Sequence, residues 1–277
     1  MPSSRPARVG IAGLGLIGAS FALALRRARP EIRITGHDGD GAVLERALER
    51  QVVDQAAASL DELGDCDVIL LAVPIAAMRA TLAGLPRGPV VTDVASTKAR
   101  VVRWAAEAGV PLVGGHPMAG REGSGLDAAE ADLFQGAAWV LTSPSPEVEE
   151  LVRAVGAEPV FLEPEEHDEL VAGISHAAFA LSAAYMLAAA ASPQWREMSR
   201  LAASGFRDLT RLASGSPEMY ASIAETNPAR LAAWVWQVEQ QLARIRRHLE
   251  QGDARLVELF EEARAARERW LKERSSG

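Results

Sequence analysis

The sequence is poor in cysteine and in net positive charge, and each shortage excludes a class of protein. Cys66 is the single cysteine, so no intrachain disulfide can form, and the composition fits a reducing compartment such as the cytoplasm. The formal net charge is −8, which argues against nucleic acid as a partner because such proteins cluster lysine and arginine. An anionic substrate would need a local positive site to overcome this field.

Export and membrane signals are also weak. Residues 1–6 (MPSSRP) lack the long apolar stretch and cleavage site of a signal peptide. Residues 171–191 carry no formal charge and are long enough to span a bilayer. This segment is mostly alanine with polar residues between, and an apolar helix in a soluble protein is usually a buried core helix. We therefore expect a cytoplasmic protein with no membrane partner, and a membrane span is the alternative.

Short apolar runs alternate with helical stretches through the first part of the chain. Strands are expected at residues 8–12, 32–36, 67–73, 89–94, 112–114, 138–142 and 160–162, and helices at 16–29 and 41–50. Strands that alternate with helices predict an α/β fold with a doubly wound parallel sheet. The nearly continuous Val, Ile and Leu of these strands fits burial on both faces.

The pattern changes after Pro164. Strand signals become rare, and residues 229–249 and 254–272 show helical apolar spacing with many charges between. The sequence therefore predicts a dinucleotide-binding α/β domain over residues 1–164 and an all-helical domain over residues 165–277.

A glycine-rich turn indicates the cofactor site. Residues 13–18 (GLGLIG) match the pattern G-x-G-x-x-G between a predicted strand and a predicted helix, which is the context that this pattern requires. Gly13 permits the tight turn, Gly15 lets the backbone approach a pyrophosphate, and Gly18 allows close helix–strand packing. The diphosphate would lie at the positive end of the helix. A chance glycine turn in a non-binding domain is the alternative.

Asp38 favours NAD over NADP. It lies 20 residues past Gly18 at the end of the second predicted strand, where a carboxylate accepts hydrogen bonds from the ribose hydroxyls and repels a 2′-phosphate. No arginine or lysine follows at residues 39–41. The predicted cofactor-binding residues are Gly13, Gly15, Leu16, Ile17, Gly18, Asp38, Val73, Pro74 and Ser96.

Two further stretches follow predicted strands, at the sheet edge where open α/β proteins bind ligands. They are residues 93–98 (DVASTK) and residues 114–122 (GGHPMAGRE). The second is a loop dense in glycine and proline around His116. A lone histidine in a loop is often only a surface or structural residue, but this position beside the expected nicotinamide favours a catalytic one.

A third stretch lies in the helical part, at residues 204–211 (SGFRDLTR). Arg207 and Arg211 are four residues apart and therefore share one face of a helix. A pair of guanidinium groups can clamp a carboxylate. Two ordinary surface arginines are the alternative.

Taken together, GLGLIG, DVASTK, GGHPMAGREGSG, ISH and SGFRDLTR, in this order, resemble the prephenate/arogenate dehydrogenases of tyrosine biosynthesis. The resemblance runs from about Arg8 to the last helix. It implies a Rossmann-type doubly wound parallel sheet followed by an all-helical dimerisation domain that forms an intertwined homodimer.

The resemblance also implies roles for individual residues. His116 would take the proton of the ring hydroxyl, and Ser96 would lie between that histidine, the hydroxyl and the nicotinamide. Arg211 would bind a substrate carboxylate and Arg207 would face the substrate side chain. The pocket would be completed by Glu122 and Ser175.

The implied reaction is NAD-dependent oxidation of a ring hydroxyl with loss of the ring carboxylate as carbon dioxide. Prephenate would give 4-hydroxyphenylpyruvate, and arogenate would give tyrosine. Many prephenate-specific members carry a second histidine where this sequence has Phe179, so arogenate or dual use is an alternative. Aromatisation drives the reaction, and we expect no metal because the sequence has no convincing ligand cluster.

Two further alternatives come from outside this reaction. A related β-hydroxyacid or imine dehydrogenase usually carries a lysine on its long interdomain helix, and residues 167–191 contain none. A non-catalytic NAD-binding protein would keep the fold without turnover, and the candidates His116, Ser96 and Arg211 argue against it.

Overall fold

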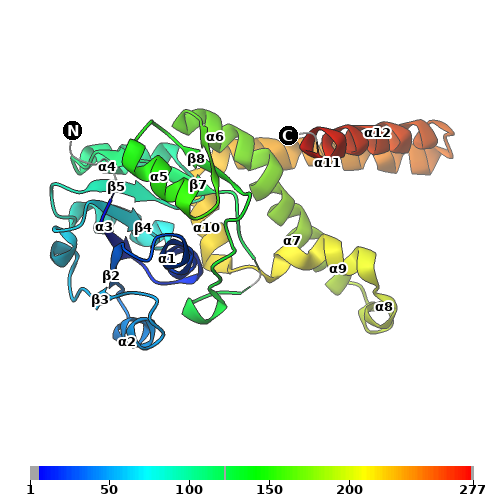
Figure 1. The fold of residues 1–277 in the computed structure, drawn as a ribbon. Helices are drawn as coiled ribbons and strands as arrows, with labels where there is room; N and C mark the ends of the chain where they lie inside the picture. The colour runs from blue at the N-terminus through cyan, green and yellow to red at the C-terminus, as the bar shows by residue number, and fades with distance from the viewer. Residues whose placement is uncertain (1–5, 122, 276–277) are drawn as a thin grey trace. The chain divides into compact units, whose positions relative to one another are not determined.

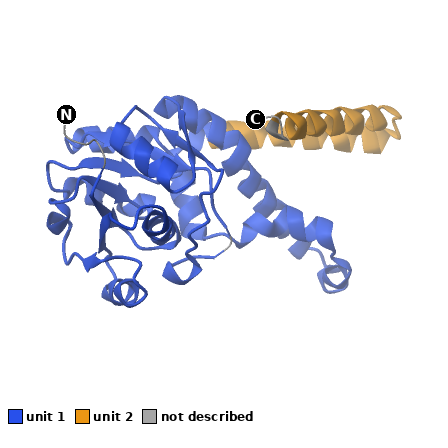
Figure 2. Cartoon of the chain, viewed as in Figure 1, with its two compact units in different colours: residues 1–230 blue, residues 231–277 orange. Residues whose placement is uncertain are grey.

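The computed structural model describes residues 6–121 and 123–275 (Figure 1). The chain divides into two compact units, residues 1–230 and 231–277 (Figure 2). The domain boundary that the sequence predicts at residue 164 coincides with the start of a helix and stays a prediction.

Six strands of the first unit form a parallel sheet in the order β3-β2-β1-β4-β5-β6. They are β1 (Arg8–Ala12), β2 (Arg33–His37), β3 (Gln55–Ala56), β4 (Val68–Leu71), β5 (Val90–Asp93) and β6 (Leu112–Val113). The order reverses between β1 and β4, and such a switch point opens a ligand-binding crevice at the carboxyl ends of the strands. The doubly wound parallel sheet is therefore confirmed.

Helices cover both faces of this sheet, as Figure 1 shows. One face packs against α1 (Leu16–Ala28), α2 (Gly41–Glu49) and α5 (Pro146–Ala154), and the other against α3 (Ile75–Ala83) and α4 (Ala99–Glu107). Successive residues of β4 alternate between the two apolar clusters: Val68 and Leu70 join the first, and Ile69 and Leu71 the second. Burial on both faces explains why the strand is apolar without a break.

Three strands that the sequence did not separate from the parallel sheet form a second one. They are β7 (Gly115–Pro117), β8 (Ala138–Leu141) and β9 (Glu158–Phe161). β7 runs antiparallel to β8, and β8 runs parallel to β9. The chain leaves the parallel sheet at Gly114, whose N–H donates to the Thr142 hydroxyl at 2.9 Å. His116, expected in a loop, is therefore a strand residue that pairs with Val140.

The apolar segment begins as α6 (Pro164–Val171), passes through a π-helical turn (Ala172–His176) and continues as α7 (Ala177–Ala190). By length and composition alone, residues 164–190 form a helix that could cross a membrane. Only 28 % of its most apolar stretch is buried within the chain, and Ile174 and Leu187 are largely exposed. The expectation of a buried core helix is therefore wrong for a single chain.

Four short elements follow: α8 (Trp195–Leu201), α9 (Ser204–Thr210), a 3₁₀ turn (Arg211–Ser214) and α10 (Pro217–Thr226). α10 returns to the sheet and packs against α3, where Ile223 is buried in the second apolar cluster. The Thr97 hydroxyl donates to Thr226 Oγ1 at 2.9 Å.

The remaining elements complete the chain. Two 3₁₀ turns lie at Leu60–Leu63 and Leu126–Ala128. Two long helices, α11 (Pro228–Gln251) and α12 (Arg255–Ser275), make up most of the second unit. Their bounds lie within a few residues of the predicted helical stretches 229–249 and 254–272. An ion pair between Arg244 and Glu262 joins the two helices at 3.6 Å.

Candidate active site

The glycine turn after β1 has the geometry of a dinucleotide site. Gly13 has φ +97°, and a Cβ there would lie 2.5 Å from the Ala72 carbonyl oxygen. A Cβ on Gly18 would lie 2.0 Å from the Gly13 carbonyl oxygen, so both positions require glycine. A Cβ on Gly15 would meet open space within 4 Å, which leaves room for a phosphate close to the backbone.

The amino terminus of α1 completes this cradle. Its N-cap, Gly15, offers no side-chain cap, and the first turn holds no acidic residue. Backbone N–H groups at such a helix end, together with the helix dipole, attract an anion. The predicted residues Leu16 and Ile17 lie in this first turn.

Asp38 lies against the same turn. Its Oδ2 accepts the Leu14 N–H at 2.8 Å, and its Oδ1 accepts the Asp40 N–H at 3.0 Å. On the neighbouring strand, Val73 and Pro74 follow β4 and lead into α3. The residues predicted around the cofactor therefore follow the carboxyl ends of β1, β2, β4 and, for Ser96, β5, and they fit a dinucleotide.

A buried ion pair joins the two predicted catalytic stretches. The Lys98 ammonium, fully buried, donates to Asp93 Oδ2 and to the Gly115 carbonyl oxygen. Asp93 in turn accepts the N–H groups of Gly115 and Ala95, each at 2.9 Å. Burial lowers the pKa of Lys98, and the negative charge of Asp93 opposes this shift. The loop that carries Ser96 is thus fastened to the strand that carries the histidine.

His116 lies on β7 with 9 % of its surface exposed. Its Nδ1 is 2.8 Å from Nε2 of His167, which begins a short chain of buried side chains. Burial holds the pKa of His116 well below its ordinary value of 6.5, and electrostatic interactions with the neighbouring His167 and Lys98 lower it further. At neutral pH His116 is therefore uncharged, the state that a general base needs.

A second histidine, His176, is buried in the π-helical turn. Neither of its ring nitrogens makes a hydrogen bond of ordinary geometry among the described residues, although the ring lies close to the Ser96 backbone. Burial lowers its pKa to about 4, although the Asp168 charge acts in the opposite direction. π-helical turns are frequent at functional sites, and Ser175, exposed in the same turn, is one of the predicted pocket residues.

The predicted arginines lie on other elements. Arg207 is exposed on α9, and Arg211, also exposed, begins the 3₁₀ turn that follows. Burial raises the pKa of Tyr220 on α10, and the positive charge of Arg211 partly opposes this rise. Arg211 is therefore close enough to the Tyr220 phenol to affect its ionisation. Glu122 lies outside the described residues. That Arg211 binds the same substrate molecule as His116, as the resemblance implies, stays a prediction.

Comparison with known proteins identifies the family. Residues 21–157 match the family description "Prephenate dehydrogenase, nucleotide-binding domain", and residues 163–262 match "Prephenate dehydrogenase, dimerization domain". A prephenate dehydrogenase from Lactococcus lactis is 33 % identical over 272 residues, which cover 94 % of this chain and 77 % of that relative. The chain belongs to the prephenate dehydrogenase family.

Solved structures of relatives share the fold over nearly the whole chain. The Synechocystis arogenate dehydrogenase is 32 % identical with a TM-score of 0.78, covering 95 % of this chain and 99 % of its own. The A. aeolicus prephenate dehydrogenase, in complex with hydroxyphenyl propionate and NAD+, is 26 % identical with a TM-score of 0.86, covering 95 % and 97 %. The protein is thus a dehydrogenase with a Rossmann-type NAD-binding domain, as its motifs predicted.

The structure places near His116 several residues that were not predicted to belong to the site. His167, Lys98 and His176 lie close to His116, and His167 is hydrogen-bonded in turn to Asp168. Lys98 and His176 belong to the DVASTK and ISH motifs, yet none of the four was among the predicted site residues. Residues 165–168 (EEHD) precede the uncharged segment 171–191. A histidine–aspartate pair just before an apolar helix is the signal that could have indicated His167 and Asp168.

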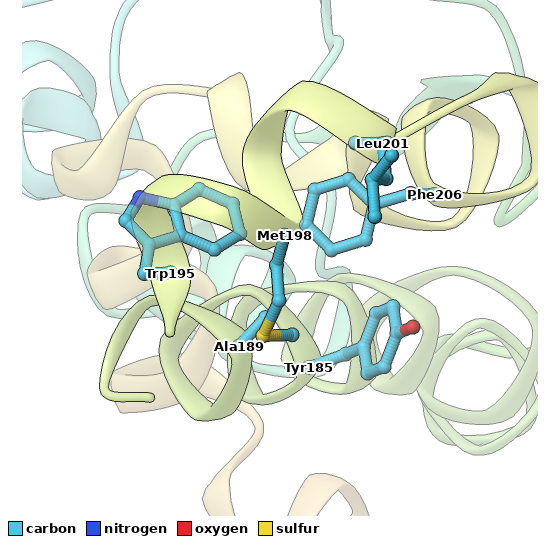
Figure 3. Close-up of a pocket in the computed structure, with 7 residues that line it drawn as sticks. Tyr185, Ala189, Trp195, Met198, Leu201 and Phe206 are labelled. Atoms are coloured by element: carbon cyan, nitrogen blue, oxygen red, sulfur yellow. The ribbon is translucent and has the colours of Figure 1, made fainter. Parts of the chain in front are cut away.

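A separate apolar pocket of about 300 Å³ lies among α7, α8 and α9 (Figure 3). Its lining residues are mostly apolar or aromatic: Tyr185, Ala189, Trp195, Met198, Leu201, Ala202 and Phe206. Tyr185 is the single titratable side chain in this lining, and no predicted site residue belongs to it. We therefore place the candidate active site at His116 and not in this pocket.

Proposed function

We propose that the protein oxidises and decarboxylates prephenate to 4-hydroxyphenylpyruvate with NAD+, as a cytoplasmic homodimer. The observation that carries this proposal is His116, a buried and uncharged imidazole fastened beside the Ser96 loop. It lies on β7, which begins two residues after β6 ends at the ligand-binding edge of the sheet.

The chemistry needs a base and an anion-binding site from the protein. The bound nicotinamide supplies the hydride acceptor for the carbinol carbon. His116 takes the proton of the ring hydroxyl, so that the O–H bond breaks as an N–H bond forms. The carboxylate then leaves as carbon dioxide, and the electron pair of the broken C–C bond completes the aromatic ring and leaves a phenolate oxygen. That oxygen takes the proton back from His116, which gives the phenol product and regenerates the base.

The positive charges have a defined task in this scheme. Prephenate carries two carboxylates, and the chain has a formal net charge of −8. Arg211 and Arg207 would bind the substrate by charge-assisted hydrogen bonds and concentrate it locally against the overall field.

Arogenate is the second candidate substrate, and Phe179 favours it. This residue stands where many prephenate-specific relatives carry histidine, and its ring stacks on Tyr220 with an interplanar angle of 7°. The Synechocystis relative is itself an arogenate dehydrogenase.

NADH formation with each substrate, measured by absorbance, separates these candidates. We expect kcat/KM for prephenate to exceed that for arogenate, because both matching family descriptions are those of prephenate dehydrogenases. A tenfold ratio corresponds to about 1.4 kcal/mol. The reverse ratio would assign arogenate. The absence of turnover with both substrates would contradict the proposed activity.

Asp38 gives a test of cofactor choice. We expect Asp38→Ser to reduce the preference for NAD+ over NADP+, measured as the ratio of kcat/KM values, by about tenfold or more, because a charge that repels the 2′-phosphate is removed. Asp40→Ser is the matched control, since Asp40 caps α2 by accepting the Ala42 N–H and serine also caps helices. An unchanged ratio in Asp38→Ser would refute this role.

A homodimer is supported by the surface of the helical segment. Residues 163–262 match the family's dimerization domain, and α7 exposes large apolar side chains such as Leu187 and Tyr185. Contact with a second copy would remove such surface from water.

A further inference from the structure

Three buried side chains form a continuous hydrogen-bonded line behind the proposed base. Nδ1 of His116 is 2.8 Å from Nε2 of His167, and Nδ1 of His167 is 2.8 Å from Oδ1 of Asp168. His167 and Asp168 are fully buried and lie on α6, far along the chain from β7. This arrangement lets one end of the line determine where protons lie at the other end.

The far end of the line is an anion. Burial by itself raises the pKa of Asp168, but hydrogen bonds from His167 and from two backbone N–H groups outweigh it and hold the pKa below 3.8. Those N–H groups belong to Lys98 and Ala99, at 2.7 and 3.0 Å. An ionised carboxylate only accepts hydrogen bonds, so Nδ1 of His167 must carry a proton.

The remaining protons follow from the donor and acceptor roles. In a neutral imidazole one ring nitrogen donates and the other accepts. Nε2 of a neutral His167 is therefore an acceptor, and Nδ1 of His116 must carry the proton that lies between the two rings. The lone pair of His116 is then at Nε2, the nitrogen that would take the substrate proton.

We propose that His167 and Asp168 are positioning residues that hold His116 in the Nδ1–H tautomer, so that its Nε2 is always ready as the base. This inference rests on the proposed function of His116. Neither residue needs to touch the substrate. When His116 takes a proton, its Nδ1–H donates more strongly to His167, and the Asp168 charge stabilises the imidazolium.

The same carboxylate also positions the second catalytic candidate. By accepting the N–H groups of Lys98 and Ala99, Asp168 caps the amino terminus of α4, directly after the loop that carries Ser96. The Asp168 carbonyl oxygen accepts a hydrogen bond from the Asn227 amide at 2.7 Å. One residue of α6 is thus connected to the serine loop, to the base and to the end of α10.

Nitrogen NMR of the unmodified protein tests the tautomer directly. Long-range proton–nitrogen spectra of the 15N-histidine-labelled full chain distinguish the three protonation states of each imidazole, and single His→Gln variants assign the five histidines. We expect Nδ1–H and a bare Nε2 for both His116 and His167 at neutral pH. A doubly protonated His167, or His116 with its proton on Nε2, would overturn the inference.

Kinetics of His167 variants test the consequence. His167→Phe removes both hydrogen bonds, and we expect kcat to fall about 10- to 100-fold with KM nearly unchanged, as when a metal-ligating histidine loses its outer hydrogen-bond partner. His167→Gln should recover part of the loss, since its amide can both accept and donate. His248→Gln, at the histidine–aspartate pair with Asp253 in the other unit (3.2 Å), should match the unmodified protein.

The NMR and kinetic experiments together distinguish a wrong role for His167 from a wrong proposed function. Unchanged kcat in His167→Phe, or a raised KM with kcat unchanged, would show that His167 does not position the base. If the unmodified protein turns over neither substrate, the proposed function fails, while the NMR spectra still decide the tautomer.

Discussion

His116→Asn should lower kcat on the order of 10²- to 10⁴-fold and leave the dissociation constant for NAD+ unchanged. The asparagine amide cannot take a proton at neutral pH, and loss of a positioned general base typically has this cost. The cofactor contacts lie elsewhere, at the Gly13 turn and Asp38. Steady-state rates and calorimetric titration with NAD+ measure the two effects separately, with His248→Asn as the control. Full turnover in His116→Asn would remove this histidine from the mechanism.

The pH dependence of the unmodified protein gives a second check on the same residue. The base acts only when deprotonated, and burial holds the pKa of free His116 well below 6.5. The value of kcat/KM, which reports the free enzyme, should therefore be level from neutral pH down to 6.5 and fall only at more acid pH. An acid limb centred above pH 6.5 would contradict an uncharged, buried base.

Arg211→Ala should chiefly raise KM for the substrate. A charge-assisted hydrogen bond to a carboxylate contributes about 2 to 3 kcal/mol, so KM should rise about 30- to 150-fold. Because Arg211 is exposed in the single chain, we expect its interaction with the carboxylate to contribute less free energy than a fully buried ion pair would. Because the guanidinium does not contact the reacting hydroxyl in this scheme, kcat should change less than KM.

Arg153→Ala is the matched control for this charge removal. Arg153 is exposed on α5 and pairs with Glu149 at 3.2 Å, an interaction of small energy at a surface. Initial rates over a range of prephenate concentrations at saturating NAD+ compare the two variants. Equal KM values for Arg211→Ala and the unmodified protein would refute the carboxylate clamp.

The elements of the parallel sheet could be predicted because their signals are local. The five strands of this sheet that the sequence predicts are apolar runs beside turn residues, and GLGLIG marks the turn from β1 into α1. The exposed two-residue strand β3 has no such signal and was not predicted. The second sheet could not be predicted in this way, because β7 pairs with β8 across residues 118–137 of intervening chain. β8 is an apolar run like the strands of the parallel sheet, whereas β7 (Gly-His-Pro) carries no strand signal, so the sequence does not indicate that the two pair.

The site was predicted in part for the same reason. His116 and Ser96 belong to compact motifs, whereas His167 meets His116 across 51 residues of sequence. The charged first turn of α6 has the appearance of a solvated helix start, and only the fold reveals that His167 and Asp168 are buried there. The π-helical turn at residues 172–176 was also not predicted, since its alanine and glycine fit an ordinary helix equally well.

The return of α10 to the sheet has a consequence for how the chain folds during synthesis. Ile223 shares one apolar cluster with Met78 and Leu82, and the Thr97–Thr226 hydrogen bond spans 129 positions. Contacts between residues so far apart in sequence form late, because the chain loses the entropy of a long loop before the contacts can stabilise it. While the ribosome is still making α7 to α9, we expect this side of the nucleotide-binding domain to lack the cover that α10 provides and to expose apolar side chains to water. The apolar cluster on this side of the sheet is complete only after α10 has left the ribosome.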